Sequence, residues 1–455
     1  MRIVNPATGE TLAEVPEAGP AAIAAAFRRA RAGQPGWAAV PLAERRAVIR
    51  RFRALVVERS EALARTLTGE VGKPIAQARR ELAGVLGRID FFVEHVEAAL
   101  ADEVVLAGGA MEERITHEPL GVVANVSAWN YPWFVGSNVF VPALLTGNAV
   151  LYKPSELATL TGLAIADLLH EAGVPADAFQ AVVGGGDVGA ALIAEPVDAV
   201  CFTGSLATGR KVAAAVAPRL LKLQLELGGK DPAYVCEDVD PAAAAAAVAE
   251  GAFYNTGQSC CAVERVYVHE RVARPFVEAF VGTVKGYVVG DPLDERTDVG
   301  PLTRREAALS LLEEQVADAT ARGARVLIGG ARLDRPGWFF APTVLGDVDH
   351  GMRVMREETF GPLIGIATVA SDDQAVERMN DTHYGLTAAV YTPDRQRAER
   401  LLARVDVGTA YWNCCDRVSP ALPWTGRRGS GLGVTLSRHG IEAFLRPRAW
   451  HLRQQ

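Results

Sequence analysis

The chain has 455 residues, of which 49% are apolar and 22% are charged. This length exceeds what one hydrophobic core normally serves, so we expect a globular protein of two or more domains. The net charge of −7 lacks the basic excess that binds nucleic acid or anionic membranes, and no apolar run is long enough to span a bilayer. Residues 1–6 also lack the apolar core of a secretory signal. We therefore expect a cytoplasmic protein with no nucleic-acid or membrane partner.

The first half of the chain alternates helical and strand-like segments. An amphipathic helix is predicted from Pro41 to about Leu67, and a second helix from about Ile89 to Leu100. Short apolar runs that end at turn residues follow. Their pattern is typical of buried strands in a parallel sheet that helices cover on both faces. The runs lie at 122–126, 149–152, 181–183 and 199–202.

A second α/β series occupies much of the remaining chain. Asp240 and Pro241 mark a helix start at an alanine-rich run, with the aspartate as N-cap. Further strands are predicted at 265–269 and 326–328, and helices near 271–284 and 305–322. The fold class is therefore expected to be α/β with two doubly wound open-sheet domains that divide near Gly228 and Gly229.

Six cysteines lie at positions 201, 236, 260, 261, 414 and 415. They are too few, and too often adjacent, for a disulfide framework, and the chain has no CxxC or HExxH pattern, so we expect no metal site. Cys201 and Cys236 lie in apolar runs, where a cysteine usually packs as an inert side chain. Cys260 instead ends the run Asn-Thr-Gly-Gln-Ser-Cys at 255–260. Its polar, glycine-containing surroundings make Cys260 a candidate nucleophile.

A candidate base precedes this thiol. Glu226 begins the run Glu-Leu-Gly-Gly-Lys at 226–230 and follows an alternating, strand-like segment at 221–225. A thiol and a carboxylate suit acyl chemistry through a thioester, because the sulfur attacks a carbonyl carbon and the carboxylate later activates water.

The two runs, in this order and at this separation, resemble the aldehyde dehydrogenase superfamily, and the further matches cover nearly the whole chain. The resemblance implies NAD(P)-dependent, non-acylating oxidation of an aldehyde to its acid. Cys260 would form a thiohemiacetal and then a thioester, and Glu226 would activate the hydrolytic water. Asn130, in the run 127–132, would bind the oxyanion together with the backbone N–H of Cys260.

The cofactor site is expected at strand ends of the first domain. The run 184–189 fits G-x-G-x-x-G only weakly, because no acidic residue follows about 20 positions on. The resemblance implies that Ser205, in a Phe-Thr-Gly-Ser turn, opens a helix facing the pyrophosphate. Lys153 and Glu156 would hold the adenine ribose, and the carboxylate of Glu156 would repel a 2′-phosphate, which favours NAD over NADP. The remaining implied cofactor residues are Trp129, Ser155, Gly186, Gly189, Phe202, Thr203, Gly204, Leu227, Gly228, Glu358 and Phe360.

The resemblance also implies a substrate pocket and an assembly arm. An aromatic, polarisable wall suits an apolar or aromatic aldehyde. Arg417 has two open roles, binding a carboxylate at the mouth or pairing with Asp416. The implied pocket residues are Tyr131, Phe134, Val135, Ser259, Cys261, Cys415 and Val418.

Three parts of the chain follow from the resemblance. Residues 1–100 and 120–228 would form the NAD-binding domain, 229–430 the catalytic domain, and 101–119 with 440–455 an oligomerisation arm of a homodimer or homotetramer.

Other functions are open at this point. A CoA-acylating semialdehyde dehydrogenase resolves the thioester with a thiol, and Glu226 argues against it. A phosphorylating enzyme would pair a histidine with the cysteine, but none of the eight histidines is near a cysteine in sequence. A catalytically silent binding scaffold is disfavoured by the intact set Asn130, Glu226 and Cys260.

Overall fold

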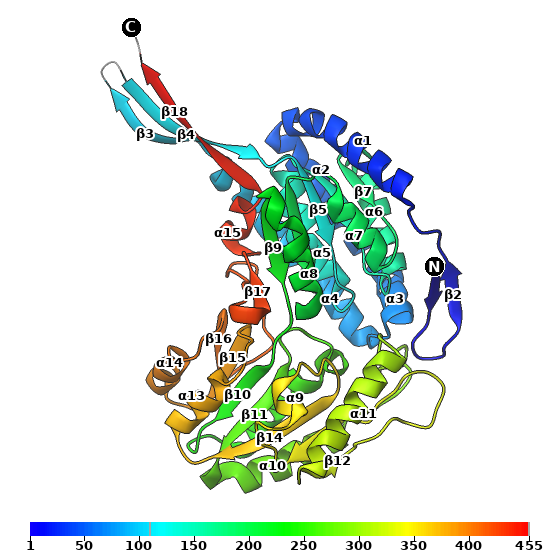
Figure 1. Ribbon diagram of the computed structural model, residues 1–455, viewed down its shortest axis with the longest axis vertical. Helices are drawn as coiled ribbons and strands as arrows, with labels where there is room; N and C mark the ends of the chain where they lie inside the picture. Colours follow the sequence, from blue (N-terminus) through cyan, green and yellow to red (C-terminus); the bar gives the residue numbers. More distant parts are fainter. Residues whose placement is uncertain (109–110, 454–455) are drawn as a thin grey trace.

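Two α/β bodies and a protruding arm make up the protein in the computed structural model, which describes residues 1–108 and 111–453 (Figure 1). The first body contains a six-stranded sheet of order β17-β9-β8-β5-β6-β7. The second contains a seven-stranded sheet of order β12-β13-β14-β11-β10-β15-β16. Neighbouring strands are parallel except in the pairs β17–β9 and β12–β13. The expected fold class, two open and mainly parallel α/β sheets, is confirmed.

The first sheet reverses its strand order beside β5. From β5 the chain adds β6 and β7 on one side, and then β8 and β9 on the other. In open α/β sheets, ligands bind at the carboxyl ends of strands where the order reverses. The strands are β5 (Val122–Val126), β6 (Ala149–Lys153), β7 (Phe179–Ala181), β8 (Ala199–Thr203), β9 (Lys222–Glu226) and the returning β17 (Gly431–Leu432).

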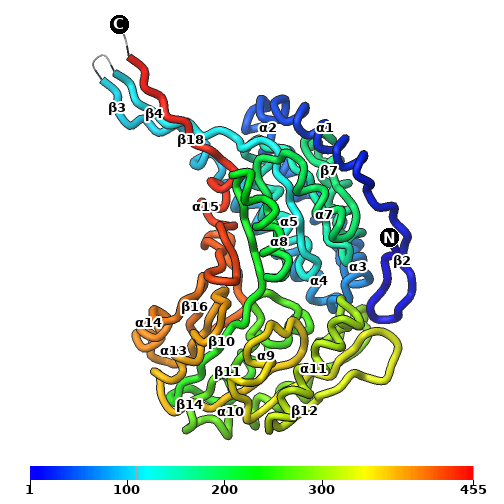
Figure 2. The backbone as a smooth tube through the Cα atoms, in the orientation of Figure 1, coloured from blue at the N-terminus to red at the C-terminus, as the bar shows by residue number. Residues whose placement is uncertain are grey.

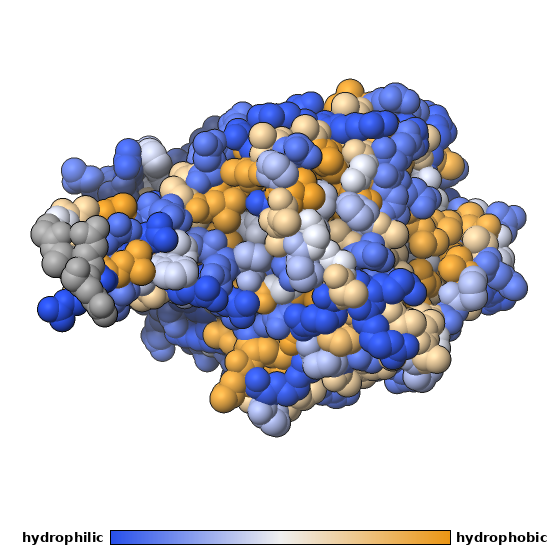
Figure 3. Space-filling model, turned by 90° about the horizontal axis from the view of Figure 1, so that it is seen from above, coloured by the Kyte–Doolittle hydropathy of each residue, from blue (hydrophilic) through white to orange (hydrophobic). Residues whose placement is uncertain are grey.

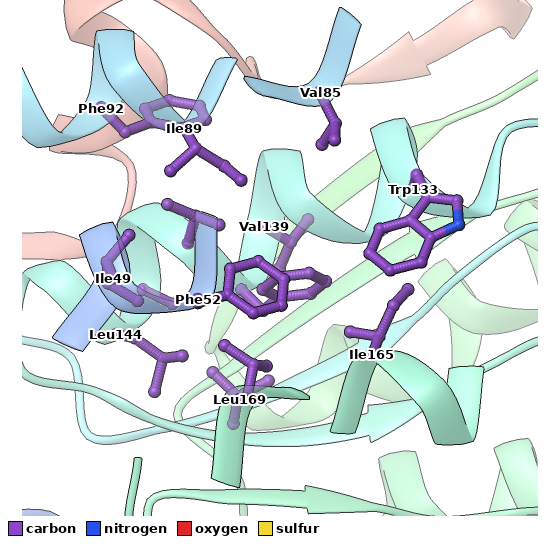
Figure 4. Packing of buried hydrophobic residues seen from close by; sticks show 14 of the residues in the cluster. Ile49, Phe52, Val85, Ile89, Phe92, Trp133, Val139, Leu144, Ile165 and Leu169 are labelled. Atoms are coloured by element: carbon purple, nitrogen blue, oxygen red, sulfur yellow. The ribbon is translucent and has the colours of Figure 1, made fainter. Parts of the chain in front are cut away.

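Helices cover both faces of this sheet because successive strand side chains point to opposite faces. Val122 and Ala124 of β5 pack with one helix group, and Val123 packs with the other. The first group is α1 (Pro20–Ala39), α7 (Gly186–Ala194) and α8 (Leu206–Val216). The second group is α2 (Leu42–Glu58), α3 (Ser60–Val71), α4 (Ile75–Leu100), α5 (Pro132–Leu145) and α6 (Thr159–Ala172). Figure 4 shows side chains of α2, α4, α5 and α6 packed together.

Two predicted helix boundaries were wrong. The helix expected from Pro41 to Leu67 is two helices, because α2 ends and α3 begins at Arg59. The break lets both short helices place their buried side chains against α4 and α6. The helix expected from Ile89 begins earlier, at Ile75, because polar residues on its buried face hid the apolar pattern.

The second body repeats the α/β arrangement. Asp240 caps its first helix as predicted, accepting from the backbone N–H of Ala242 at 2.9 Å. Its strands are β10 (Asp231–Val235), β11 (Val263–His269), β12 (Arg325–Ile328), β13 (Thr343–Gly346), β14 (Leu363–Val369), β15 (Thr387–Tyr391) and β16 (Thr409–Trp412). Its helices are α9 (Pro241–Phe253), α10 (Glu270–Lys285), α11 (Glu306–Ala321), α12 (Arg353–Arg356), α13 (Asp372–Asn380) and α14 (Arg395–Leu402).

The chain passes between the bodies next to the residues singled out in the sequence. It leaves the first body after β9, enters the second at β10, and returns from β16 to β17 (Figure 2). Glu226 ends β9, so this carboxylate lies at the junction. None of the helices in the described residues is long and apolar enough to cross a membrane.

The arm is a three-stranded antiparallel sheet of order β18-β4-β3. Its strands are β3 (Glu103–Gly108), β4 (Met111–Pro119) and β18 (Leu445–Arg453), and α15 (Ser437–Glu442) leads into β18. Residues 109–110 and 454–455 of the expected arm lie outside the described part of the chain. Edge strand β3 leaves Val104 and Val105 more than 60% exposed, and Figure 3 shows apolar surface on the arm, at the left of the view. A long exposed apolar edge of this kind favours pairing with another chain.

A buried ion pair lies behind the loop that follows β5. Lys73, between α3 and α4, pairs with Glu81 of α4, and both side chains are almost completely buried. The Lys73 Nζ also donates to the carbonyl oxygen of Asn130 at 2.7 Å, and Glu81 accepts from the backbone N–H of Trp133 at 3.0 Å. Burial raises the pKa of Glu81 and lowers the pKa of Lys73, and their mutual attraction opposes both shifts.

Replacing Lys73 with methionine should destabilise the protein strongly. The Lys73→Met change leaves the Glu81 carboxylate buried without its partner, which costs about 3–5 kcal/mol in comparable pairs. The urea midpoint followed by circular dichroism should fall, and Glu81→Gln in the same background should recover part of it. Lys211→Met on an exposed lysine is the matched control. Equal midpoints for Lys73→Met and the control would contradict this account.

Candidate active site

A cavity of about 660 Å³ lies between the two bodies. It is lined by side chains of α4, α5 and α9, the end of β9, the turn before β11 and the loop after β16. Cys260 and Glu226 both line this cavity, so the structure brings the candidate nucleophile and the candidate base together. The same wall contains all seven residues expected in the substrate pocket, namely Tyr131, Phe134, Val135, Ser259, Cys261, Cys415 and Val418.

The turn that carries Cys260 has an unusual backbone. Asn255, Thr256 and Gly257 all have positive φ, at 53°, 60° and 69°. Glycine and asparagine tolerate this left-handed region, whereas a β-branched residue such as threonine adopts it only when its surroundings hold it there. The Gln77 side chain accepts from the Asn255 N–H at 2.9 Å, and the Thr256 hydroxyl accepts from the Gly300 N–H at 3.0 Å. The thiol is therefore carried on a rigid turn and is itself half-buried.

Asn130 follows the carboxyl end of β5 and is buried. Its carbonyl oxygen accepts from the Lys73 Nζ at 2.7 Å and from the Asn255 side chain at 3.2 Å. These bonds connect the loop after β5 directly to the turn that precedes Cys260. Within the described residues, the Asn130 side-chain amide makes no hydrogen bond to a protein acceptor, so its donors are free for another group. Asn130 does not itself line the cavity, although its neighbour Tyr131 does.

Glu226 is held by hydroxyl groups. The Thr435 hydroxyl donates to its Oε1, and the Thr203 hydroxyl is 3.5 Å from its Oε2. Burial raises the pKa of Glu226, while the Thr435 hydrogen bond and the charge of Arg88 act in the opposite direction. A carboxylate with a raised pKa is a stronger base than an exposed glutamate, which suits the activation of water.

The residues expected to hold the cofactor gather at one edge of the first sheet. Lys153 ends β6 and is buried, with its Nζ donating to the Pro154 carbonyl at 3.0 Å and lying 3.4 Å from the exposed Glu156 carboxylate. Ser155 is buried beside them, and Gly186 and Gly189 lie in the first turn of α7. Phe202 to Ser205 end β8 and open α8, where Ser205 accepts from the Thr208 N–H at 3.3 Å. All of these residues lie at carboxyl ends of parallel strands or at helix starts beside the strand-order reversal.

Two more predicted cofactor residues come from the second body. Glu358 accepts from the Gly229 N–H at 3.2 Å, and a side chain on Gly228 would collide with it. Burial raises the pKa of Glu358 to about 8. Phe360 packs edge-to-face with Trp129 at a ring-centroid distance of 5.5 Å. Leu227, between Glu226 and Gly228, is buried against Gly209 of α8.

Sequence reasoning missed the charged residues that support the site. Glu264 accepts from the backbone N–H of Phe360 at 2.9 Å and pairs with Lys230, so it anchors the loop around Glu358. Glu81 and Arg88 lie on the buried stripe of α4, at helical spacing from Val85 and Phe92. Charges on an apolar stripe are a readable signal. Thr435 gave no signal, because a lone threonine far along the chain has no distinguishing neighbours.

Arg88 is the most unusual of these charges. It is buried, lines the cavity and donates to the Asn138 side-chain oxygen at 2.9 Å, yet no carboxylate of the described residues forms an ion pair with it. Its guanidinium lies 3.9 Å from the centroid of the Phe134 ring, and Phe134 stacks on Tyr131. Burial lowers the pKa of Arg88 to about 10, and the charges of Glu226 and Glu81 oppose this shift.

The cavity contains a thiol and a carboxylate and lies next to the strand-order reversal of an open α/β sheet, where such sheets bind nucleotides. These features are typical of α/β enzymes that use a thiol nucleophile. The model of the aldehyde dehydrogenase family matches residues 1–450. Aminoaldehyde dehydrogenase 2, peroxisomal, from Malus domestica is 36% identical, covering 97% of this chain and 90% of the relative. The chloroplastic betaine aldehyde dehydrogenase from Amaranthus hypochondriacus is 35% identical, covering 97% of this chain and 91% of the relative.

Solved structures agree with this match. An Escherichia coli enzyme described as NADP dependent superposes with a TM-score of 0.97 at 34% identity, covering 100% of this chain and 94% of the other. Lactaldehyde dehydrogenase from Escherichia coli superposes with a TM-score of 0.96 at 32% identity, covering 100% and 96%. The chain belongs to the aldehyde dehydrogenase family, and it is an NAD(P)-dependent enzyme that oxidises an aldehyde. The resemblance read from the sequence is confirmed.

Removing the Thr435 hydroxyl should move the pH dependence of activity. The hydroxyl stabilises the ionised form of Glu226, so Thr435→Val should raise the pKa of Glu226 further. If Glu226 is the base, thioester hydrolysis needs the ionised carboxylate, and the acidic limb of the rate should move up by about one pH unit, the value of one lost hydrogen bond to a charged group. Single-turnover hydrolysis of the acyl-enzyme across pH measures this shift. Thr425→Val, which removes a nearby hydroxyl bonded to a backbone carbonyl, should leave the limb in place.

Proposed function

We propose that the protein oxidises aldehydes to carboxylic acids with NAD, using Cys260 as nucleophile, Glu226 as base and Asn130 as oxyanion donor. The observation that carries the proposal is that Cys260 and Glu226 line one cavity, although they come from different bodies. The carboxylate argues for hydrolysis of the thioester by water rather than transfer of the acyl group to coenzyme A.

The chain's own groups account for each step except acceptance of the hydride. Cys260 releases its thiol proton to solvent and attacks the aldehyde carbon as thiolate, and the Asn130 amide and the Cys260 N–H stabilise the resulting oxyanion. Held by Lys153, Glu156 and Glu358, a nicotinamide cofactor would supply the acceptor for the hydride that the thiohemiacetal carbon must lose to become a thioester on Cys260. Glu226 then takes a proton from water as its oxygen attacks the thioester carbon, and the acid leaves as the thiol is restored.

The sheet edge of the first body has residues that fit a dinucleotide. Lys153 and Glu156 would hold the adenine ribose, the start of α8 would face the pyrophosphate, and Glu358 would hold the nicotinamide ribose. A buried lysine next to an exposed carboxylate fits two ribose hydroxyls and disfavours a 2′-phosphate. We therefore propose NAD as the preferred cofactor. The similar E. coli structure is described as NADP dependent, so NADP is the alternative. Activity measured with each cofactor distinguishes the two.

Two substitutions should separate the two chemical steps. Cys260→Ala removes the nucleophile and should abolish NADH formation, whereas Glu226→Gln should release a burst of NADH and then stall as acyl-enzyme. Stopped-flow absorbance follows the burst, and intact-protein mass spectrometry detects the trapped acyl group. Wild-type rates in Cys260→Ala would refute the mechanism. Release of acyl-coenzyme A instead of free acid would support the acylating alternative.

The substrate proposed here is an aldehyde with a terminal ammonium group, in place of the apolar or aromatic aldehyde expected from the sequence. The relatives named above act on aminoaldehydes and betaine aldehyde. The cavity wall here also contains Glu250, an exposed carboxylate, and the aromatic rings of Tyr131, Phe134, Tyr254 and Trp424. Carboxylates and aromatic faces both attract ammonium groups.

A second candidate is an aldehyde with a terminal carboxylate. Arg88 favours it, because a buried guanidinium without an ion-pair partner can bind a carboxylate through two parallel hydrogen bonds. The exposed Arg417 lines the same cavity and makes no ion pair with Asp416 in the described part of the chain. The pairing with Asp416 that the sequence left open is therefore not formed.

A panel of three aldehydes of equal chain length distinguishes these candidates. The terminal group is ammonium, carboxylate or methyl, and each aldehyde is assayed with NAD and with NADP by absorbance at 340 nm. We expect kcat/KM for the ammonium aldehyde to exceed that for the methyl aldehyde by about tenfold, the effect of roughly 1–2 kcal/mol of cation–π and charge interaction. Glu250→Gln should reduce only this preference. A carboxylate preference that Arg88→Met abolishes would establish the second candidate instead.

We infer that the arm serves assembly of a homodimer or homotetramer. Its β3 edge is exposed and apolar at Val104, Val105 and Leu106, and the sheet protrudes from the two bodies (Figure 1). Pairing with another copy would cover this edge and remove its aggregation hazard.

A further inference from the structure

Two adjacent thiols, of Cys260 and Cys261, line the same cavity, and the mechanism above uses one of them. Either sulfur could in principle attack an aldehyde that enters there. The structure treats the two differently, because Cys260 is half-buried while Cys261 is buried against the core of the first body. The Cys261 sulfur contacts the Asp416 carboxylate and the Ser259 hydroxyl.

Asp416 contacts both sequence neighbours of the nucleophile. One carboxylate oxygen, Oδ1, accepts from the Ser259 hydroxyl at 3.1 Å and from the Cys261 thiol at 2.9 Å. These residues lie immediately before and immediately after Cys260. A single oxygen therefore fixes the turn on both sides of the nucleophile and occupies the Cys261 hydrogen in a bond.

The loop that presents Asp416 is rigid. Asn413 and Asp416 both have positive φ, at 53° and 48°, a region that asparagine and aspartate adopt more readily than other non-glycine residues, so hydrogen bonds rather than backbone strain hold the loop. The Asn413 side chain bonds the backbone of Thr392 in both directions, at 2.9 and 3.0 Å, and the Tyr411 hydroxyl donates to the Arg417 carbonyl. Both ends of the loop are thus tied to the second body, and the carboxylate position is set in advance.

We infer that Asp416 is a positioning residue that holds Ser259 and Cys261 so that Cys260 alone presents a reactive sulfur to the aldehyde. This inference rests on the proposed function. The chemistry of Cys261 agrees with it: the neighbouring Cys260 sulfur, burial and the Asp416 carboxylate hold the pKa of the Cys261 thiol well above its usual range. A thiol that stays protonated is a poor nucleophile.

The test compares Asp416→Ala and Asp416→Asn in the full-length enzyme. Iodoacetamide labelling, read by peptide mass spectrometry, should modify Cys260 and spare Cys261 in the wild type. Asp416→Ala should raise the Cys261 labelling rate about tenfold and lower kcat about tenfold with little change in KM, because a misplaced nucleophile costs rate rather than binding. Asp416→Asn keeps an accepting oxygen and should stay within about threefold of wild type. Asp373→Ala, on an exposed aspartate of the second body, is the control.

A double-mutant cycle separates positioning from general damage. In a Ser259→Ala, Cys261→Ala background, Asp416→Ala should lower kcat no further, since both bonds are already gone. If Asp416→Ala does not fold, the Ser259→Ala variant alone, with one bond removed, should still show kcat lowered about threefold and an unlabelled Cys261.

Three results would overturn the inference. They are unchanged labelling and kcat in Asp416→Ala, an equal loss of kcat in the double background, and a raised KM at constant kcat, which would assign Asp416 to substrate binding. The labelling pattern is independent of turnover. Failure of the proposed function would appear instead as aldehyde oxidation by Cys260→Ala.

Discussion

The cavity that contains Cys260 and Glu226 depends on one backbone carbonyl, that of Asn130. Lys73, between α3 and α4, and Asn255, in the turn before Cys260, both donate to this oxygen. The first donor belongs to the first body and the second belongs to the second body, so the two bodies meet at this atom. Because Lys73 is buried, its charge needs Glu81, and Glu81 in turn fixes the start of α5 through the Trp133 N–H. A buried ion pair therefore positions the loop that would bind the oxyanion.

The partner of each buried carboxylate around the cavity, rather than its residue type, decides whether its charge is neutralised. Glu81 and Glu264 are neutralised by lysines, and both support backbone groups of loops. Glu226 and Asp416 face the cavity with hydroxyl or thiol donors as their hydrogen-bond partners. A carboxylate held by neutral donors keeps its charge available for a proton, a substrate or a neighbouring thiol, whereas one paired with lysine does not. Arg88 is a positive charge held in the same way, because its hydrogen-bond partner is the neutral side chain of Asn138. Its guanidinium stacks on Phe134 and places a buried cation in the wall of the pocket.

Sequence motifs predicted aldehyde oxidation because the residues that point to it lie in short local runs. The turn at 255–260 contains an asparagine and a glycine, which tolerate a left-handed backbone, and Gly228 leaves room for Glu358, so both runs are visible as sequence patterns. Helix boundaries were less accessible. The break at Arg59 has no glycine or proline to mark it, and buried polar residues obscured about the first four turns of α4.

The sequence by itself determined the α/β class, the family and the strings that carry Cys260, Glu226 and Asn130, because strand and helix periodicity and turn chemistry are local properties. Tertiary structure alone decided which groups hold Asn130, Glu226 and Cys261 in place. The bonds from Lys73 to Asn130, from Thr435 to Glu226 and from Asp416 to Cys261 join residues 57, 209 and 155 positions apart. No local pattern encodes such pairs, since each depends on how distant segments of the chain pack together in the folded protein and on how much water their contact excludes.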